Sequence, residues 1–162
     1  MSTAGQQAEM EKELTLTRVF AAPRTLVFEA WSKPEHLQMW WGPGHGFTNP
    51  AVKVDFRVGG EWQIVMRGPD GVEFPCGGVY KEIVPPEKLV FTNDVIGPDG
   101  TLFLEGLTTV LLAEEAGKTK LTLHVRAVGH VPFAAQMLAG MEEGWSGSLV
   151  QLADFLAAAT RS

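Results

Sequence analysis

Cysteine is nearly absent from this chain of 162 residues, in which Cys76 is the only one. A lone cysteine permits no internal disulfide and no metal site built from several thiolates, and this usage fits a reducing compartment. A secretion signal is also lacking, because residues 1–12 (MSTAGQQAEMEK) have neither a basic start nor an apolar stretch. We therefore expect a cytoplasmic protein whose residues 1–12 form a disordered polar tail.

Basic residues and long apolar runs are scarce as well. There are 13 Lys and Arg against 19 Asp and Glu, so the formal net charge is −6. Such a chain repels phosphate backbones and anionic lipid unless its basic residues gather on one face, and the sequence contains no such cluster. The longest apolar runs, such as residues 110–113, fall far short of the ~20 residues that a membrane-spanning helix needs. We expect neither nucleic acid binding nor membrane insertion.

Motifs for metals and common cofactors are missing. The four histidines are never three or four residues apart, which is the spacing of a metal-binding pair on a helix. Neither a phosphate-binding loop nor a nucleophile elbow is complete. The sequence therefore predicts no metal site and no cofactor. Residues 42–46, which are glycine-rich and include His45, form a candidate lid for a cavity.

Turn-forming residues divide the middle of the chain at regular intervals, with GG at 59–60, PDG at 69–71, PP at 85–86 and GPDG at 97–100. Between these turns apolar and polar residues alternate, which predicts antiparallel strands with one buried face. We expect strands at 13–20, 52–58, 72–83, 88–95, 102–113 and 119–127, and another after the Gly-Gly turn with Trp62, Ile64 and Met66 on its apolar face.

Helical patterns flank these strands on both sides. Two short helices are expected after the first strand, one with Pro23 at its first position and one opened by a capping box at residues 32–35. From 133 to 159 apolar residues recur three or four apart, which predicts one long amphipathic helix. Its glycines weaken it by roughly 1 kcal/mol each relative to alanine. We interpret Gly140, Gly144 and Gly147 as positions where a strand, a ligand or another backbone comes close.

The expected elements combine into an α+β fold. An antiparallel sheet with one apolar face must cover that face, and the final helix is the only element long enough to do so. We expect a single domain over residues 13–162, with a curved antiparallel sheet of six or seven strands wrapped around the C-terminal helix.

Several short segments follow one another in the order of a known pattern. They are RVFAAP at 18–23, WWGP at 40–43, DFRVGG at 55–60, GVYKEI at 78–83, PPEKLVFT at 85–92 and GW at 144–145. Together they resemble single-domain proteins related to the C-terminal domain of the heat-shock protein 90 ATPase activator, within the START, polyketide-cyclase and birch-pollen-allergen (SRPBCC) superfamily. The resemblance covers about residues 13–159 and implies the helix-grip fold. Superfamily members bind lipids and hormones, cyclise polyketides or assist a chaperone, so the resemblance implies no single activity.

The candidate ligand-binding residues are the large apolar side chains expected to point between the sheet and the final helix. Aromatic rings and flexible methionines suit an apolar guest of variable shape. The same residues would also fill a close-packed core, and the sequence leaves both interpretations open. They are Phe28, Trp31, Trp62, Ile64, Met66, Phe74, Tyr80, Phe91, Met137, Met141 and Trp145.

Polar residues in apolar strands are further candidates. Arg18 shares a strand face with apolar residues, so its guanidinium either holds an anionic group in the pocket or reaches water at the sheet edge. The Tyr80 hydroxyl is either a polar handle in the pocket or a cap on the sheet edge. Glu73 is expected to face outward, whereas the face of Glu105 is not assigned because Gly106 adjoins it.

Three functions fit these observations. The first is binding of a small hydrophobic or amphipathic molecule in a cavity between the sheet and the C-terminal helix. The second is a cyclase, dehydratase or hydrolase in the same cavity, which requires at least two polar groups converging on the substrate. The third is a protein-interaction role with a chaperone as partner, against which the absence of the activator's extra N-terminal domain counts. A monomer and a homodimer are both compatible with the sequence.

Overall fold

The computed structural model describes residues 11–42, 44, 46–97 and 99–161. The polar tail expected over residues 1–12 lies mostly outside the described residues. Its last two residues belong to the first strand, which begins at Glu11 rather than at the expected position 13. The lid residue His45 is likewise outside the described part of the chain.

A single antiparallel sheet of seven strands dominates the structure, in the order β1-β7-β6-β5-β4-β3-β2. Its alternating burial follows the alternating sequence, as in β7, where Leu121, Leu123 and Val125 are buried between more exposed neighbours. The expected α+β fold is therefore confirmed. The strands are β1 (Glu11–Phe20), β2 (Thr48–Val54), β3 (Glu61–Arg67), β4 (Glu73–Val84), β5 (Lys88–Ile96), β6 (Leu102–Glu115) and β7 (Lys118–Gly129).

The strand expected over 52–58 is wrong in its bounds, because β2 ends at Val54. The chain then turns back, with the Gly60 N–H donating to Arg57 O at 2.8 Å. Gly59 has φ +86°, a conformation that favours glycine, and a Cβ on Gly60 would collide with Asp55 O. The apolar residues alternate in the sequence as far as Val58, but the strand does not extend that far, and the Val58 side chain is 60% exposed.

Two short helices follow β1, as expected: α2 (Arg24–Ser32) and α3 (Pro34–Trp40). Their ends differ from the expected ones. Pro23 is the N-cap of α2 rather than its first helical residue. The expected capping box is wrong, because Ser32 ends α2 and its hydroxyl donates to Glu29 O at 3.3 Å, while Lys33 is the N-cap of α3.

The long C-terminal helix expected over 133–159 is two helices, α4 (Ala134–Ala139) and α5 (Met141–Arg161). The break lies at Gly140, whose φ of −90° and ψ of 1° are outside the helical region. The apolar periodicity continues through this point because the spacing of apolar residues carries no information about where the backbone leaves the helical conformation.

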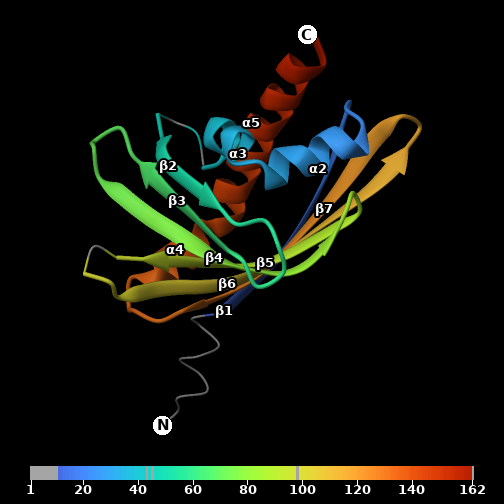
Figure 1. The fold of residues 1–162 in the computed structure, drawn as a ribbon. Helices are drawn as coiled ribbons and strands as arrows, with labels where there is room; N and C mark the ends of the chain where they lie inside the picture. Colours follow the sequence, from blue (N-terminus) through green and yellow to red (C-terminus); the bar gives the residue numbers. More distant parts are fainter. Residues whose placement is uncertain (1–10, 43, 45, 98, 162) are drawn as a thin grey trace.

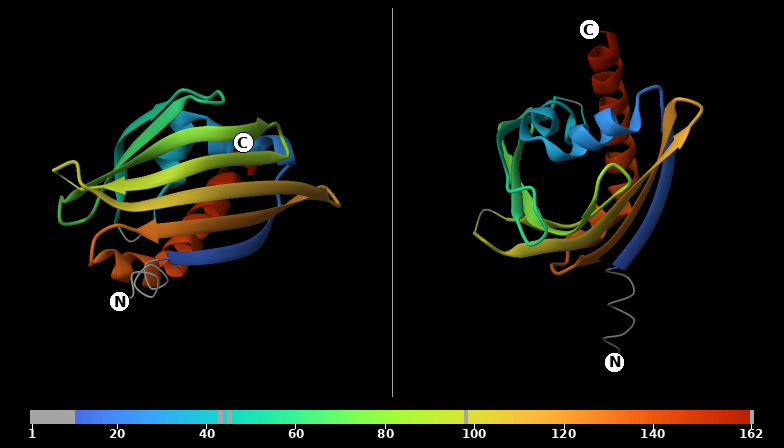
Figure 2. Two further views of the ribbon diagram at one scale, coloured as in Figure 1. Left: turned by 90° about the horizontal axis from the view of Figure 1, so that it is seen from below. Right: turned by 45° about the vertical axis from the view of Figure 1, so that its right-hand side comes forward.

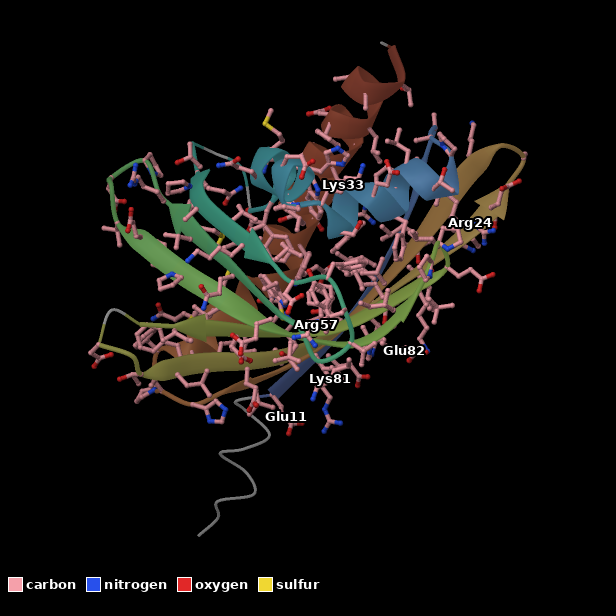
Figure 3. The ribbon with its side chains drawn as sticks, in the orientation of Figure 1. Glu11, Arg24, Lys33, Arg57, Lys81 and Glu82 are labelled. Atoms are coloured by element: carbon pink, nitrogen blue, oxygen red, sulfur yellow. The ribbon has the colours of Figure 1, made fainter. Side chains whose placement is uncertain are left out.

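The sheet curves around α5, which runs along its concave face, while α2 and α3 close the space between β2 and α5 (Figures 1 and 2). The centre of the core is fully buried and contains Leu149 and Leu152 of α5 together with Leu121 and Leu123 of β7. The charged side chains of Lys33, Lys81 and Glu82 lie on the outside of this fold (Figure 3). None of the helices in the described part of the chain is long and apolar enough to cross a membrane.

The α5 contact predicts a large effect of truncating a core side chain. Leu152→Ala should lower the free energy of unfolding by about 2–5 kcal/mol, because it leaves a cavity between helix and sheet. Val150→Ala, two residues earlier on the exposed side of α5, should change it by less than about 0.5 kcal/mol. Chemical denaturation measures both, and equal losses would contradict this packing of α5.

Candidate functional site

An open groove of about 260 Å³ lies between the sheet and the two C-terminal helices. Strands β3, β5 and β6 line one side of it, and α4 and the first turns of α5 line the other (Figure 1). The loop after α3 contributes its rim. The side chains that line the groove include Trp41, Met66, Asn93, Met137, Met141 and Trp145.

The space deeper in the core, beyond Trp41, is filled by aromatic side chains. The cavity left among Trp31, Trp62, Tyr80 and Phe91 measures only about 10 Å³, which is room for about one water molecule. The rings pack edge to face, with the Trp62 and Phe91 centroids 5.6 Å apart. The two interpretations of the apolar set therefore apply at different depths, a packed core inside and an open groove outside.

The candidate residues separate accordingly. Met66, Met137, Met141 and Trp145 line the groove. The deep set consists of Trp31, Trp62, Ile64, Tyr80 and Phe91.

Two aromatic candidates lie elsewhere. Phe28 is buried against Phe56, with ring centroids 5.9 Å apart. Phe74, the second residue of β4, is 38% exposed and packs against Phe47. Neither ring is among those that line the groove.

Arg18 connects β1 to α5. Its side chain lies on the same face of β1 as Leu14 and Leu16, as the alternation predicts. Its guanidinium donates to Thr17 O at 2.8 Å and to Ser146 Oγ at 3.4 Å. It does not line the groove, so its contacts assign it to holding α5 on the sheet.

Burial keeps two reactive groups protonated. It raises the pKa of Cys76 to about 12, an increase that a hydrogen bond with Trp41 partly opposes. The Cys76 thiol donates to Ile64 O at 3.3 Å. Burial also raises the pKa of Tyr80 well above its usual value. Both groups are neutral at physiological pH, so neither acts as an anionic nucleophile or base there.

The acidic candidates face away from the groove. Glu73 is exposed and forms an ion pair with Arg67 at 2.6 Å. Glu105 is exposed and lies 3.1 Å from Nε2 of His130. On the adjacent strand, the pKa of Asp94 is raised by burial and by the charge of Glu105, and His130 opposes this. The polar candidates therefore occupy separate places on the molecule.

Hydrogen bonds fix the rim of the groove on α5. The Ser148 hydroxyl donates to Gly42 O at 2.8 Å, and Gln151 Nε2 donates to the same oxygen at 2.9 Å. From the other side, the Asn49 amide donates to Trp41 O at 2.9 Å. The Trp41 ring is also held by packing: it lies edge to face on Trp145, with ring centroids 5.7 Å apart.

The groove offers polar groups but no charge. Among the described residues that line it, none carries a titratable side chain. Asn93 Oδ1 is buried and accepts no hydrogen bond from the described residues. An ionised group placed here would lose its hydration without gaining a partner, so the groove suits uncharged molecules.

Sequence reasoning placed Gly42 in the candidate lid but missed several other lining residues, namely Trp41, Asn93, Val95, Leu104 and Ser148. A signal was available for two of them, because Asn93 and Val95 continue the alternation of Leu89 and Phe91 along β5. Trp41 and Gly42 follow α3 in a loop, where no periodicity applies.

A second groove, of about 320 Å³, lies on the opposite face of β3, β4 and β5. Gly77 and Gly78 are among its lining residues. A Cβ on Gly77 would lie 2.6 Å from Trp62 O, and one on Gly78 would collide with Thr92 O. Close strand approach therefore explains the two glycines.

No group of three or more His, Cys, Asp or Glu side chains suited to a metal ion occurs within the described ranges.

Comparisons with known proteins agree with this architecture. The profile of a family described as "Activator of Hsp90 ATPase homolog 1-like protein" matches residues 21–157. The crystal structure of the AHSA1 protein from Silicibacter pomeroyi is similar, at 31% identity and a TM-score of 0.77, covering 91% of this chain and 99% of that chain.

Two further solved structures are also similar. A protein from Chromobacterium violaceum is 29% identical with a TM-score of 0.75, covering 89% of this chain and 96% of that chain. A protein from Arthrobacter aurescens is 26% identical with a TM-score of 0.76, covering 90% of this chain and 86% of that chain. A search of the curated proteins gave no match.

The raised pKa of Cys76 predicts a loss of stability at alkaline pH. Unfolding lowers that pKa from about 12 to its ordinary value of 9.0. The unfolded chain therefore binds fewer protons above about pH 9, and the free energy of unfolding should fall there by up to about 1.4 kcal/mol per pH unit. Below about pH 9 this thiol contributes no slope.

Denaturant titrations between about pH 8 and pH 10.5 measure this slope. Cys76→Ala should make it shallower while leaving the contribution of Tyr80. A variant with the same slope as the wild type would show that the native thiol ionises normally.

Proposed function

Because the chain belongs to the family of Hsp90 ATPase activator homolog 1-like proteins, we propose that it binds a small, uncharged, hydrophobic or amphipathic molecule in the groove between the sheet and helices α4 and α5. The observation that carries this proposal is the apolar, charge-free lining of that groove. Rings and thioethers surround a space of about 260 Å³ that the chain leaves open.

The volume of the groove limits its ligand. Small-molecule pockets usually measure ~300–1,000 Å³, so about 260 Å³ lies just below that range and suits a guest smaller than a typical drug-sized molecule. Met66, Met137 and Met141 border the space on three elements, and unbranched thioether side chains adapt to guests of different outline. The rim held by Ser148 and Gln151 supplies a fixed edge.

The catalytic alternative finds no comparable support. It requires polar groups that converge on one substrate atom. Arg18 contacts Ser146, Tyr80 lies in the packed interior, and Glu105 pairs with His130 on the opposite face. The chaperone alternative rests on the family's name alone. We infer a cytoplasmic location from the single buried thiol, Cys76.

A charge placed in the groove tests the proposed function. We use 2-naphthol, an uncharged two-ring phenol, as the probe in isothermal titration calorimetry. Met137→Glu puts a carboxylate in the groove lining and should weaken binding at least about tenfold, because the carboxylate would be desolvated by the probe.

The matched control is Gln136→Glu, which adds the same charge on the exposed side of α4. It should bind 2-naphthol as the wild type does, with a melting temperature close to that of Met137→Glu. Equal affinity in both variants would place the probe elsewhere, and absence of binding to the wild type would count against an uncharged aromatic guest.

A further inference from the structure

Gly144 occupies a position in α5 where glycine is unfavourable. It is the fourth residue of a helix of 21 residues. Glycine in a helix costs about 1 kcal/mol relative to alanine, because it loses more conformational freedom on folding. A compensating reason for this residue must therefore lie in its surroundings.

The usual structural reasons for a glycine are absent at this position. Gly144 does not have the positive φ of the glycines in the turns, such as Gly59. It is not needed for close packing either, because, apart from its two chain neighbours and the backbone of its own helix, no atom of the described residues lies within 4 Å of where its Cβ would be. Gly77 and Gly78 differ in this respect, since their Cβ atoms would strike a neighbouring strand.

The empty space beside Gly144 belongs to the groove. The residue is part of the groove lining, together with Met141 and Trp145 of the same helix and Trp41 across the rim. Of the three explanations that the sequence left open, a strand and another backbone are both excluded by the missing contacts. A ligand is the explanation that remains.

We propose that Gly144 is the specificity-determining position of the groove, and that an uncharged ligand with a flat aromatic ring lies directly on the α5 backbone there. This inference rests on the proposed function and adds the ligand class and the residue that selects it. The Trp41 and Trp145 rings line the same groove as Gly144, and aromatic rings stack favourably on each other at offset or edge-to-face geometry.

The methionines around the position support an aromatic guest. The side chains of Met66, Met137 and Met141 all line the same groove. Thioether sulfur makes favourable contacts with aromatic rings, most often at the ring edge. A ring that lies on the glycine backbone presents its edge to the surrounding side chains, whereas a side chain on residue 144 would occupy the place of the ring.

Substitutions of increasing size at residue 144 test this inference, again with 2-naphthol in calorimetry. Gly144→Ala should weaken binding about tenfold, because even one methyl group in a fitted apolar pocket changes affinity by about that much. Gly144→Leu should abolish measurable binding. Both variants should melt at or above the wild-type temperature, because each raises helix propensity in open space.

Glu143→Leu is the matched control, since it puts the same side chain on the same helix one residue earlier, at an exposed position. It should bind 2-naphthol as the wild type does. The carboxylate analogue 2-naphthoate should bind the wild type at least about tenfold more weakly than 2-naphthol, because none of the described residues that line the groove is cationic.

The outcomes separate the two claims. If the wild type does not bind 2-naphthol, both the proposed aromatic ligand class and the site for this probe are overturned. If the wild type binds and Met137→Glu does not, while Gly144→Ala and Gly144→Leu bind as tightly as Glu143→Leu, the groove remains the site and the role of Gly144 is overturned. If 2-naphthoate binds as tightly as 2-naphthol, the requirement for an uncharged ligand is overturned.

Discussion

The packing of α5 on the concave face of the sheet is the contact on which the rest of the structure depends. Each strand presents alternate apolar residues to one side, and that face is stable only when another element removes it from water. Leu149 and Leu152 of α5 belong to the same fully buried core cluster as Leu121 and Leu123 of β7. Arg18 adds a polar link from β1 to the same helix. A curved sheet and one helix thus form the core.

The groove is the part of the concave face that α5 does not fill. Toward the inside, Trp31, Trp62, Tyr80 and Phe91 close the space almost completely. Toward α4 the helix is interrupted at Gly140 and has no side chain at Gly144, so space remains between it and the strands. Hydrogen bonds from Ser148 and Gln151 hold the rim in place. The groove to which we assign the proposed function therefore exists because one helix covers only part of the sheet.

The sequence predicted what depends on periodicity and missed what depends on local geometry. Alternation located the strands and put Met66 on the inner face, and the pattern of three and four placed Met137, Met141 and Trp145 on the side of the C-terminal helices that faces the sheet. It also continued through Val58 and Gly140, where the chain turns or the helix breaks, because apolar spacing carries no information on backbone conformation. Which apolar side chains pack and which border open space depends on the relative placement of elements, and no single segment encodes that.

The central proposal is that a small uncharged molecule occupies this groove rather than another surface. The most direct measurement follows the methyl NMR signals of the methionines during titration with 2-naphthol. Met66, Met137 and Met141 line the groove, whereas Met39 on α3 is 71% exposed and is not among the lining residues. The account predicts shifts of the first three signals and none for Met39. Shifts confined to Met39, or to backbone amides at Gly77 and Asp94 on the opposite face, would contradict it.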